Sequence, residues 1–466
     1  MIASHTLYEL RGEKLNADLI NSARPCLRLF RPLSFLLFLL QARFGFHLVP
    51  SPLLCLRLLP IELTASPYTM PSRRNLQKSL AATLLCAGNL ASAGLVYVSS
   101  YSKTVTTLNY THGQNTGIQK LSPVAVSQSC SDNPTWLTLD SPDSILYCLN
   151  EGLNTPNGGL TAFKTSPGGT LQKLGQISTA NGPVSGVVFG NNRHGLALAH
   201  YGGSAFTTYD VSNPNKLKLL QTKNFKLTGP PADPSRQDAP HPHEAVLDPT
   251  GKFLLVPDLG MDLIHLYSFD PNTLALKDIT PVSVKPGSGP RHITFVVKGS
   301  KTFAYLVTEL GNTIIGYDVT YPNGQIKLTE IFNIPSHGAG PAEPSSYAAS
   351  EVVVSPDSNY LIVSSRAENS TTIPDFDNPS VTIPSDPLIN FKIDATTGQL
   401  QVLQVVPAGG QFPRQFSINK EGNLLAVGLQ DDGRVVFVDR CPETGLLGGF
   451  VAYADIAGQI TAAIFA

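Results

Sequence analysis

Three arginines, a histidine and a glutamate in this sequence carry side chains suited to acid–base chemistry on a small anion. Arg291, Arg366 and Arg414 present planar guanidinium groups, which bind a carboxylate or a phosphate through two parallel hydrogen bonds. His243 and Glu309 are candidate proton-transfer groups, because burial and neighbouring arginines would shift their pKa values. We therefore predict catalytic roles for His243, Glu309 and Arg366. Arg291 and Arg414 are predicted to hold a small carboxylate or phosphate substrate.

A repeated two-strand unit places these residues at matching positions. Each unit has a Pro or small residue, an apolar stretch, a tight turn, a second apolar stretch and then a polar side chain. The units begin about 50–60 residues apart, a period typical of propellers and solenoids. They read PTWLTLDSPDSILYCLNEG, PVSGVVFGNNRHGLALAHYGG, PHEAVLDPTGKFLLVPDLGMD, PRHITFVVKGSKTFAYLVTELGN, ASEVVVSPDSNYLIVSSRAEN and PRQFSINKEGNLLAVGLQDDG.

Each unit predicts one propeller blade, because a third strand and a fourth follow the first two. The two ends of the chain supply a further blade: LVYVSSYSKTVTTLNY resembles a second and a third strand, and QITAAIFA resembles a first strand. Their pairing would close the circle and remove exposed strand edges. The predicted fold is all-β, a seven-bladed β-propeller of four-stranded antiparallel blades over residues 94–466. An open solenoid is the alternative, and the complementary half-units argue against it.

The propeller geometry predicts that the polar positions converge. The first strand of each blade lines the channel, and antiparallel pairing brings its start level with the end of the second strand. Equivalent residues should therefore meet at one mouth of the channel. They include Glu151, His200, His243, Asp258, Arg291, Glu309, Arg366, Arg414 and Gln430. Asp258 and Gln430 are thus predicted as further substrate ligands, although a slip of one residue in the register would alter the set.

The same residues also have structural interpretations. His243 could pack between blades, and Arg414 could bridge neighbouring blades. We expect Glu244 and Glu351 to accept hydrogen bonds from backbone amides, and His292 to pack in the interior. Because buried charges are costly unless they are paired or used, the Arg, Glu and His set as a whole favours a functional site.

The composition limits the partners and cofactors. The formal charge is −1 and charged residues make up 14% of the chain, so no basic face points to nucleic acid. The sequence has no CxxC pair, no metal-ligand spacing and no glycine loop that would cradle a phosphate. His241-Pro-His243 has no clear third ligand. We predict no metal or other cofactor.

The first 93 residues lack the repeat. Residues 1–69 are predicted to be a leader or an over-extended gene model. Residues 70–93 predict a secretory signal peptide, because a basic segment with Arg73 and Arg74 precedes an apolar segment and the small residues Ala91-Ser92-Ala93. A membrane-proximal or organellar leader over residues 1–93 is the alternative.

We expect the mature protein to be secreted or attached to the cell wall, with a cytoplasmic location as the alternative. The apolar segment Leu33–Leu40 is too short to span a bilayer, so no stable membrane anchor is predicted. Cys130 and Cys148 flank the first hairpin and could form a disulfide in an oxidising compartment.

Several stretches resemble the lactonase family of seven-bladed β-propellers, which includes 6-phosphogluconolactonases and fungal carboxy-cis,cis-muconate cyclases. They are HPHEAVLDPTGKFLLVPDLGMD, GSGPRHITF, YLVTELGNTIIGYDV, SEVVVSPDSNYLIVSSRAEN and GGQFPRQFSINKEGNLLAVGLQDDG. The resemblance implies an active site made of His243, Arg291, Glu309 and Arg366, with Arg414 nearby. Gln415 and Ser365 depart from the family pattern, which has His and Asn at these places, and these departures bear on the substrate more than on the fold.

Two functions follow as hypotheses. The first is an enzyme that hydrolyses or forms a lactone C–O bond in a small anionic substrate, and the residues do not choose between hydrolysis and cyclisation. The second is a secreted or cell-wall propeller that binds without catalysis, because a fold does not fix a function.

Overall fold

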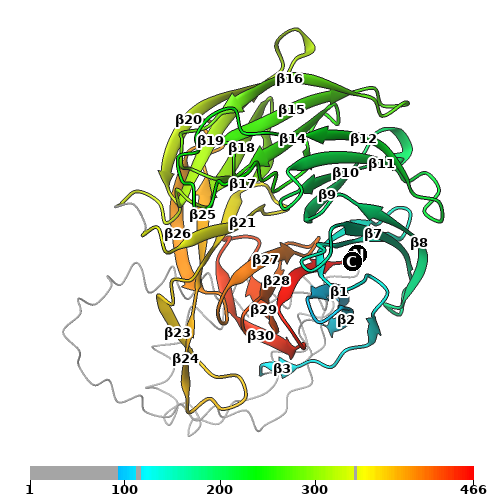
Figure 1. Cartoon of the computed structure of the whole chain (residues 1–466). Helices are drawn as coiled ribbons and strands as arrows, with labels where there is room; N and C mark the ends of the chain where they lie inside the picture. Colours follow the sequence, from blue (N-terminus) through cyan, green and yellow to red (C-terminus); the bar gives the residue numbers. More distant parts are fainter. Residues whose placement is uncertain (1–92, 112–116, 341–343) are drawn as a thin grey trace, which may run out of the picture. The chain divides into compact units, whose positions relative to one another are not determined.

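Short strands rich in Val, Ile, Leu and aromatic residues fold the chain into seven blades arranged in a ring (Figure 1). The computed structural model describes residues 93–111, 117–340 and 344–466. Tight turns join the strands, and the turn after β13 (Val246–Leu247) shows how. There the Asp248 carboxylate accepts hydrogen bonds from the backbone amides of Thr250, Lys252 and Phe253, which fixes the reversal of the chain.

The blades are numbered in the order in which the chain completes them, and each runs from its innermost to its outermost strand. Blades 1 to 3 are β5 (Pro134–Asp140), β6 (Ile145–Asn150), β7 (Gly158–Thr165) and β8 (Leu171–Thr179); β9 (Pro183–Phe189), β10 (Gly195–His200), β11 (Ala205–Asp210) and β12 (Lys218–Asn224); β13, β14 (Phe253–Asp258), β15 (Leu263–Phe269) and β16 (Leu276–Ser283). Blades 4 and 5 are β17 (Pro290–Lys298), β18 (Lys301–Thr308), β19 (Thr313–Thr320) and β20 (Lys327–Pro335); β21 (Ala348–Val354), β22 (Tyr360–Arg366), β25 (Pro387–Ile393) and β26 (Leu400–Pro407).

The last two blades involve both ends of the propeller. Blade 6 is β27 (Pro413–Ile418), β28 (Leu424–Leu429), β29 (Arg434–Arg440) and β30 (Leu447–Asp455), with the short β3 (Gln119–Lys120) added parallel to β30. Blade 7 is β31 (Ile460–Phe465), β1 (Ala93–Ser100), β2 (Thr104–Thr111) and β4 (Ala125–Ser127). Two short 3₁₀ turns, Asn191–Arg193 and Pro322–Gly324, connect strands.

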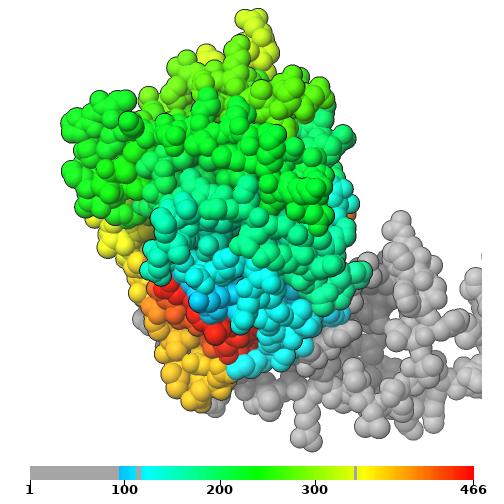
Figure 2. All heavy atoms as spheres, turned by 45° about the vertical axis from the view of Figure 1, so that its right-hand side comes forward, coloured from blue at the N-terminus to red at the C-terminus, as the bar shows by residue number. Residues whose placement is uncertain are grey.

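Blade 7 closes the ring by joining the two ends of the propeller. β31 pairs antiparallel with β1, which places Val96 opposite Phe465 and Val98 opposite Ala463. Figure 2 shows this junction on the surface, where the blue first strand and the red last strand lie side by side. The predicted seven-bladed, all-β fold and its closure by both termini are confirmed.

The hydrophobic core lies between neighbouring blades. Seven clusters of buried side chains each join one blade to the next. Between blades 4 and 5, for example, Tyr305 and Val307 pack with Leu361 and Val363. Because the facing sheets of neighbouring blades pack together in this way, the innermost strands are held at fixed positions around the channel.

A β-bulge at the start of the innermost strands aims one residue at the channel mouth. In β17, Pro290 pairs with Thr308 and His292 with Val307, so Arg291 is the extra residue. A bulge redirects the side chain of the extra residue. The same irregularity recurs in β5, β9, β21, β27 and β31, at Thr135, Val184, Ser350 with Glu351, Arg414 and Thr461.

A hairpin inserted in blade 5 fastens it to blade 6. It consists of β23 (Thr371–Pro374) and β24 (Thr382–Ser385). Phe376 in its turn stacks on Tyr453 of β30 at 4.9 Å, and Asp377 forms an ion pair with Arg434 of β29 at 3.2 Å. This insertion therefore strengthens one blade interface.

Cys130 and Cys148 form a disulfide between the segment before β5 and the middle of β6, with their Cα atoms 6.0 Å apart. Both residues are buried between blades 7 and 1. Replacing both with alanine should lower the free energy of unfolding by about 3 kcal/mol, because the bridge closes a loop of 18 residues in the unfolded chain. Urea unfolding of the oxidised protein and the double variant measures this difference. Equal stabilities would show that the bridge is absent in solution.

The predicted leader (residues 1–69) and all but the last residue of the predicted signal peptide (residues 70–93) lie outside the described residues. Within the part of the chain that the structure describes, no helix is long and apolar enough to cross a membrane.

Candidate active site

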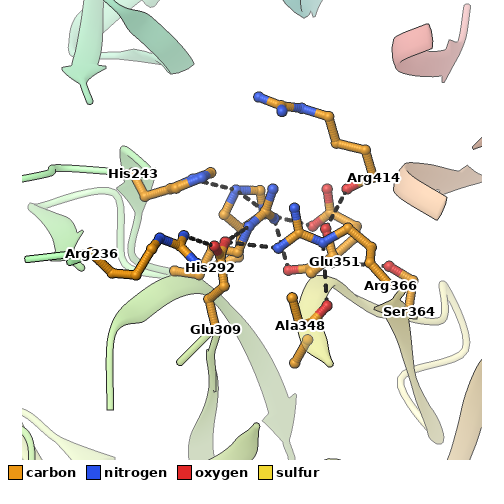
Figure 3. A network of polar contacts seen from close by, with 12 residues as sticks. Arg236, His243, His292, Glu309, Ala348, Glu351, Ser364, Arg366 and Arg414 are labelled. Carbon is orange, nitrogen blue, oxygen red and sulfur yellow. Dashed lines mark hydrogen bonds and ion pairs between the residues drawn. The ribbon is translucent and has the colours of Figure 1, made fainter. Parts of the chain in front are cut away.

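A cavity of about 450 Å³ opens at the channel mouth where the innermost strands begin. Charged side chains from five blades and from one long connection line it. They include Glu151, Arg236, His243, Arg291, Glu309, Arg366 and Arg414. Figure 3 shows the hydrogen-bonded network that several of these residues form. The structure thus brings His243, Arg291, Glu309 and Arg366 together, as predicted from the repeat.

Glu309 lies at the centre of the cluster and contacts three arginines. Its Oε2 atom accepts a hydrogen bond from Arg291 Nε at 3.0 Å and lies 2.8 Å from Arg366 Nη2. Its Oε1 atom accepts a hydrogen bond from Arg236. Burial alone would raise the pKa of Glu309, but Arg366, Arg291 and Arg236 hold this pKa well below its ordinary value. A carboxylate held in this way is a weak base, so the geometry favours a role for Glu309 in orienting the arginines over proton transfer.

Arg291 is the most deeply buried of the arginines in the cluster, with 1% of its surface exposed. Its Nη1 atom donates a hydrogen bond to the Ser350 carbonyl in the next blade at 2.8 Å. Burial and the nearby Arg366 lower the pKa of Arg291 to about 9, which leaves it charged at neutral pH. Arg291 therefore bridges blades 4 and 5 and carries a fixed positive charge at the floor of the site.

His243 lies just before β13. Its position in blade 3 is equivalent to that of Arg291 in blade 4, because each residue follows the Pro that pairs with the second strand. Its backbone N–H donates to the Pro257 carbonyl at 2.9 Å, and its ring meets the edge of Tyr201 with the centroids 5.7 Å apart. Burial, together with Arg291, His292, Arg414 and Arg366, lowers the pKa of His243 well below its ordinary value. The imidazole is therefore neutral at neutral pH and can accept a proton at its unprotonated nitrogen.

Two arginines in the cavity retain hydrogen-bond donors for a ligand. Arg366 donates from Nε to the Ala348 carbonyl at 3.2 Å and stacks over Phe412. Its Nη2 atom is buried and forms an ion pair with Glu309 Oε2 at 2.8 Å, so a ligand can meet only the remaining part of this guanidinium group. The Arg414 guanidinium makes no hydrogen bond or ion pair with any residue that the structure describes, and Figure 3 shows it apart from the network. Tyr101, Glu151 and Glu309 raise its pKa against the effect of burial, so it stays charged.

The hairpin register decides which residue at the end of the second strand reaches the cavity. One residue of each hairpin lies opposite the Pro near the start of the first strand, or opposite Ala349 in β21: Asn150, His200, Asp258, Thr308, Ser365 and Leu429. The residues that follow these are Glu151, Tyr201, Leu259, Glu309, Arg366 and Gln430, and all of them except Leu259 line the cavity. Successive residues point to opposite sides of a strand, so only the second set faces the ligand.

Asp258 does not line the cavity, because it belongs to the first of these two sets. Its buried carboxylate accepts hydrogen bonds from the backbone N–H of His241 at 2.8 Å and of Gly260 at 3.0 Å, and His265 Nε2 lies 3.1 Å away. The predicted role of Asp258 as a substrate ligand therefore rests on a register that is wrong by one residue. Gln430 does line the cavity, and its buried Oε1 atom has no hydrogen-bond partner.

Comparison with known proteins places the chain in a family. The family described as "Lactonase, 7-bladed beta-propeller" matches residues 95–463. This chain belongs to that family. It is 31% identical over 378 residues to a protein of Arthroderma benhamiae named "Probable 6-phosphogluconolactonase", a match that covers 81% of this chain and 89% of the relative. It is 27% identical over 319 residues to the 6-phosphogluconolactonase of Formosa agariphila, covering 68% and 83% of the two chains.

A solved structure shares the fold of this lactonase-family chain. The periplasmic gluconolactonase of Pseudomonas aeruginosa superposes with a TM-score of 0.68 at 23% identity, over 80% of this chain and 99% of the other. The likeness supports the propeller architecture described above.

The two departures from the family pattern lie outside the cavity lining. Gln415 donates to the Phe416 carbonyl at 3.0 Å and accepts from the Ala463 amide at 2.7 Å, so it links blade 6 to blade 7. Ser365 is buried, and its Oγ atom has no hydrogen-bond partner. Neither residue would contact a ligand in the cavity, so each could affect binding only by positioning a neighbouring residue.

Arg236 is the principal residue that the sequence analysis missed. It lies in the connection between β12 and β13, which runs from the outermost strand of blade 2 to the innermost strand of blade 3. Such a connection must arrive at the mouth where the innermost strand begins, so a long one can place side chains over the cavity. The length of residues 225–245 is the signal that could have pointed to it. Tyr201 was missed for a different reason, because the register slip assigned its place to His200.

Two glutamates beside the site have structural contacts. Glu244 accepts a hydrogen bond from the Ile293 amide of the neighbouring blade at 2.6 Å, in line with the role expected for it. Glu351 contacts His292, whose Nδ1 atom lies 2.9 Å from Glu351 Oε1. Among residues 93–111, 117–340 and 344–466, no group of three or more His, Cys, Asp or Glu side chains is arranged to hold a metal ion.

Proposed function

We propose that this protein hydrolyses the lactone of a small anionic sugar acid, in the manner of a 6-phosphogluconolactonase. The observation that carries the proposal is the unpaired guanidinium group of Arg414, which lines the same cavity as Arg366 and the neutral His243. Guanidinium groups with free donors suit a phosphate or carboxylate. The names of the relatives favour hydrolysis over cyclisation, because both of the sequence relatives above are named as lactonases.

In this mechanism the arginines hold the substrate and His243 activates water. Arg414 binds the anionic group at the open side of the cavity. The unprotonated nitrogen of His243 removes a proton from water as the water oxygen attacks the lactone carbonyl carbon. The positive charge of the Arg366 guanidinium, which lines the cavity, stabilises the oxyanion of the tetrahedral intermediate. The C–O bond of the ring then breaks, and the leaving oxygen takes the proton back from His243.

Glu309 would act indirectly in this reaction. Its carboxylate fixes the Nε atom of Arg291 and contacts Arg366 and Arg236, so these cations do not need to reorganise when the substrate binds. Preorganised charge of this kind is the main source of transition-state stabilisation in many enzymes.

Replacing Arg414 with methionine should raise KM for 6-phosphogluconolactone by about 10- to 100-fold, because a charged hydrogen bond to the substrate is lost. The value of kcat should change little, since Arg414 lies away from the Glu309 cluster. The uncharged D-glucono-1,5-lactone should show a much smaller change in KM. Steady-state hydrolysis of both lactones by the wild-type and variant proteins makes the comparison.

Lys252→Met is a matched control, because this exposed lysine lies in a turn at the opposite end of blade 3 and its removal changes the net charge equally. An equal rise in KM for both lactones would contradict the assignment of Arg414 to the anionic group. Absence of hydrolysis of either lactone by the wild-type protein would overturn the proposed function.

Secretion is part of the proposal, and the buried Cys130–Cys148 bridge supports it, because structural disulfides persist in oxidising compartments. N-terminal sequencing of the protein recovered from culture medium should give a chain that begins at Gly94. A mature chain that begins well before Gly94 would contradict cleavage of a signal peptide at this point.

A further inference from the structure

A buried hydrogen-bond chain leads from His243 away from the cavity to Glu351. His243 Nδ1 lies 3.2 Å from His292 Nε2, and His292 Nδ1 lies 2.9 Å from Glu351 Oε1. His292 is 1% exposed and Glu351 5% exposed, so water does not compete for these contacts. Figure 3 shows His292 and Glu351 in the same network of polar contacts as His243. The three residues come from blades 3, 4 and 5, and the bulges at the starts of β17 and β21 set their approach.

The direction of the hydrogen bonds follows from the groups at each end. A carboxylate only accepts, so His292 must carry its proton on Nδ1. Arg291 Nη1 lies 3.4 Å from His292 Nε2, and a guanidinium only donates, so this nitrogen must present a lone pair. Burial and Arg291 lower the pKa of His292, although Glu351 opposes them, which agrees with a neutral ring. His243 Nδ1 must then be the donor to His292.

We propose that His292 and Glu351 are positioning residues that hold His243 with its proton on Nδ1 and its Nε2 lone pair free for the substrate water. The catalytic consequence rests on the proposed function, whereas the proton positions do not. The hydrogen bond to His292 supplies this constraint, because an imidazole without such a partner carries its proton on either nitrogen.

The charged groups around this chain support the arrangement. Arg291, Arg366 and Arg414 face His243 from blades 4, 5 and 6 and disfavour a positive charge on it before the reaction. Beside Glu351 lies Glu244, whose pKa burial and the charge of Glu351 raise well above its ordinary value. Glu351 Oε1 is fixed by the Val352 amide at 3.0 Å, which leaves it aimed at His292.

During hydrolysis the chain would also disperse the charge that His243 acquires. When the water proton arrives at His243 Nε2, the ring becomes an imidazolium whose Nδ1–H points at the His292 lone pair. The His292 Nδ1–H in turn points at the Glu351 carboxylate. The positive charge is therefore stabilised toward Glu351 and returns when His243 gives its proton to the leaving ring oxygen.

Nitrogen-15 NMR of the full chain labelled at histidine tests the proton positions without any substrate. The pattern of nitrogen–proton couplings distinguishes an Nδ1–H ring from an Nε2–H ring, and the signals lost in His243→Gln identify His243. We expect His243 and His292 both to be Nδ1–H in the wild-type protein at neutral pH. A His243 ring protonated on Nε2 in the wild-type protein would overturn the proposal.

Variants then test whether His292 and Glu351 cause this arrangement. His292→Phe should turn His243 to the Nε2–H form and lower kcat about 10- to 100-fold with KM little changed. Glu351→Gln should keep the Nδ1–H form, because the Val352 amide still orients the side-chain carbonyl, and should lower kcat less than His292→Phe, because only the negative charge that stabilises the imidazolium is lost. Glu351→Leu should behave like His292→Phe. Thermal unfolding confirms that each variant is folded.

The outcomes separate this proposal from the proposed function. If His292→Phe folds and leaves His243 in the Nδ1–H form, His292 does not position it. If the proton positions change as expected while the wild-type protein hydrolyses no lactone, the positioning role stands and the substrate class is wrong. His194→Gln, at an exposed turn, is the matched control and should alter neither the spectrum of His243 nor kcat.

Discussion

Replacing His243 with glutamine should lower kcat for lactone hydrolysis by about 100- to 10,000-fold, the range expected when a general base is removed. Glutamine has a similar size and can still donate to His292, but it cannot accept the proton of the attacking water. KM should change little, because Arg414 still holds the anionic group. Steady-state kinetics of 6-phosphogluconolactone hydrolysis measures both quantities, with the spontaneous hydrolysis of the lactone subtracted.

The comparison with His194→Gln makes this result specific. His194 is an exposed histidine in the turn before β10, on the opposite side of the propeller from the mouth. Its replacement should leave kcat within about twofold, since a surface substitution away from the site has little effect. If His243→Gln keeps full activity, another group activates the water and the proposed mechanism fails.

Replacing Glu309 with glutamine should lower the free energy of unfolding by about 3–5 kcal/mol at pH 7, because removing one partner leaves buried charges without compensation. Arg291 has 2% of its side chain exposed and Arg366 has 7%, so neither guanidinium can regain full hydration. Activity should fall as well, since both arginines lose the group that orients them. Urea unfolding followed by circular dichroism measures the difference in stability.

The pH dependence of this difference has a definite sign. The pKa of Glu309 is lower in the folded protein than its ordinary value of 4.5. The contribution of the carboxylate to stability is therefore fully present above about pH 4.5 and is lost as the pH falls through the folded pKa. The gap between the wild-type protein and Glu309→Gln should narrow from pH 5 toward pH 3.

Glu330→Gln is the control for this experiment, because Glu330 lies exposed on β20 of the same blade. It should change stability by no more than about 0.5 kcal/mol. Equal effects of the two substitutions, or a gap for Glu309→Gln that widens in acid, would contradict the three-arginine cluster.

The sequence carries enough information for the fold and for most of the site, because both follow from a repeat. Prolines at the strand starts and polar turns mark each hairpin, and the half-units at the two ends indicate closure by β31 and β1. Arg291 and Arg414 could be predicted as one set, since the same bulge recurs at the start of β17 and β27. Rotation about the propeller axis then brings these residues together without any knowledge of side-chain packing.

The rest of the site depends on features that a repeat does not specify. Asp258 was predicted at the mouth, but the pairing of Asp258 with Pro242 places it one residue early and turns it toward backbone amides. Arg236 belongs to a connection that occurs once in the chain, so no column contains it. The hydrogen bond between His292 and Glu351 joins two blades, and its length depends on packing that the sequence pattern does not describe.

The role of Glu309 also changed once its surroundings were known. A glutamate near several arginines is a candidate for proton transfer when only its type and repeat position are known. Three guanidinium groups in contact hold its pKa well below the ordinary value, so the proposed mechanism assigns proton transfer to the neutral His243 instead. The role of Glu309 depends on how many arginines contact it and at what distances, and a sequence repeat specifies neither.

A crystal structure of the full chain with 6-phosphogluconate, the product of the proposed reaction, is the most direct test. The phosphate should contact Arg414, and the carboxylate at C1 should lie within hydrogen-bond distance of both the Arg366 guanidinium group and His243 Nε2. A product molecule bound away from the channel mouth, or a mouth that stays empty at saturating concentration, would contradict the proposal that these side chains form one catalytic site.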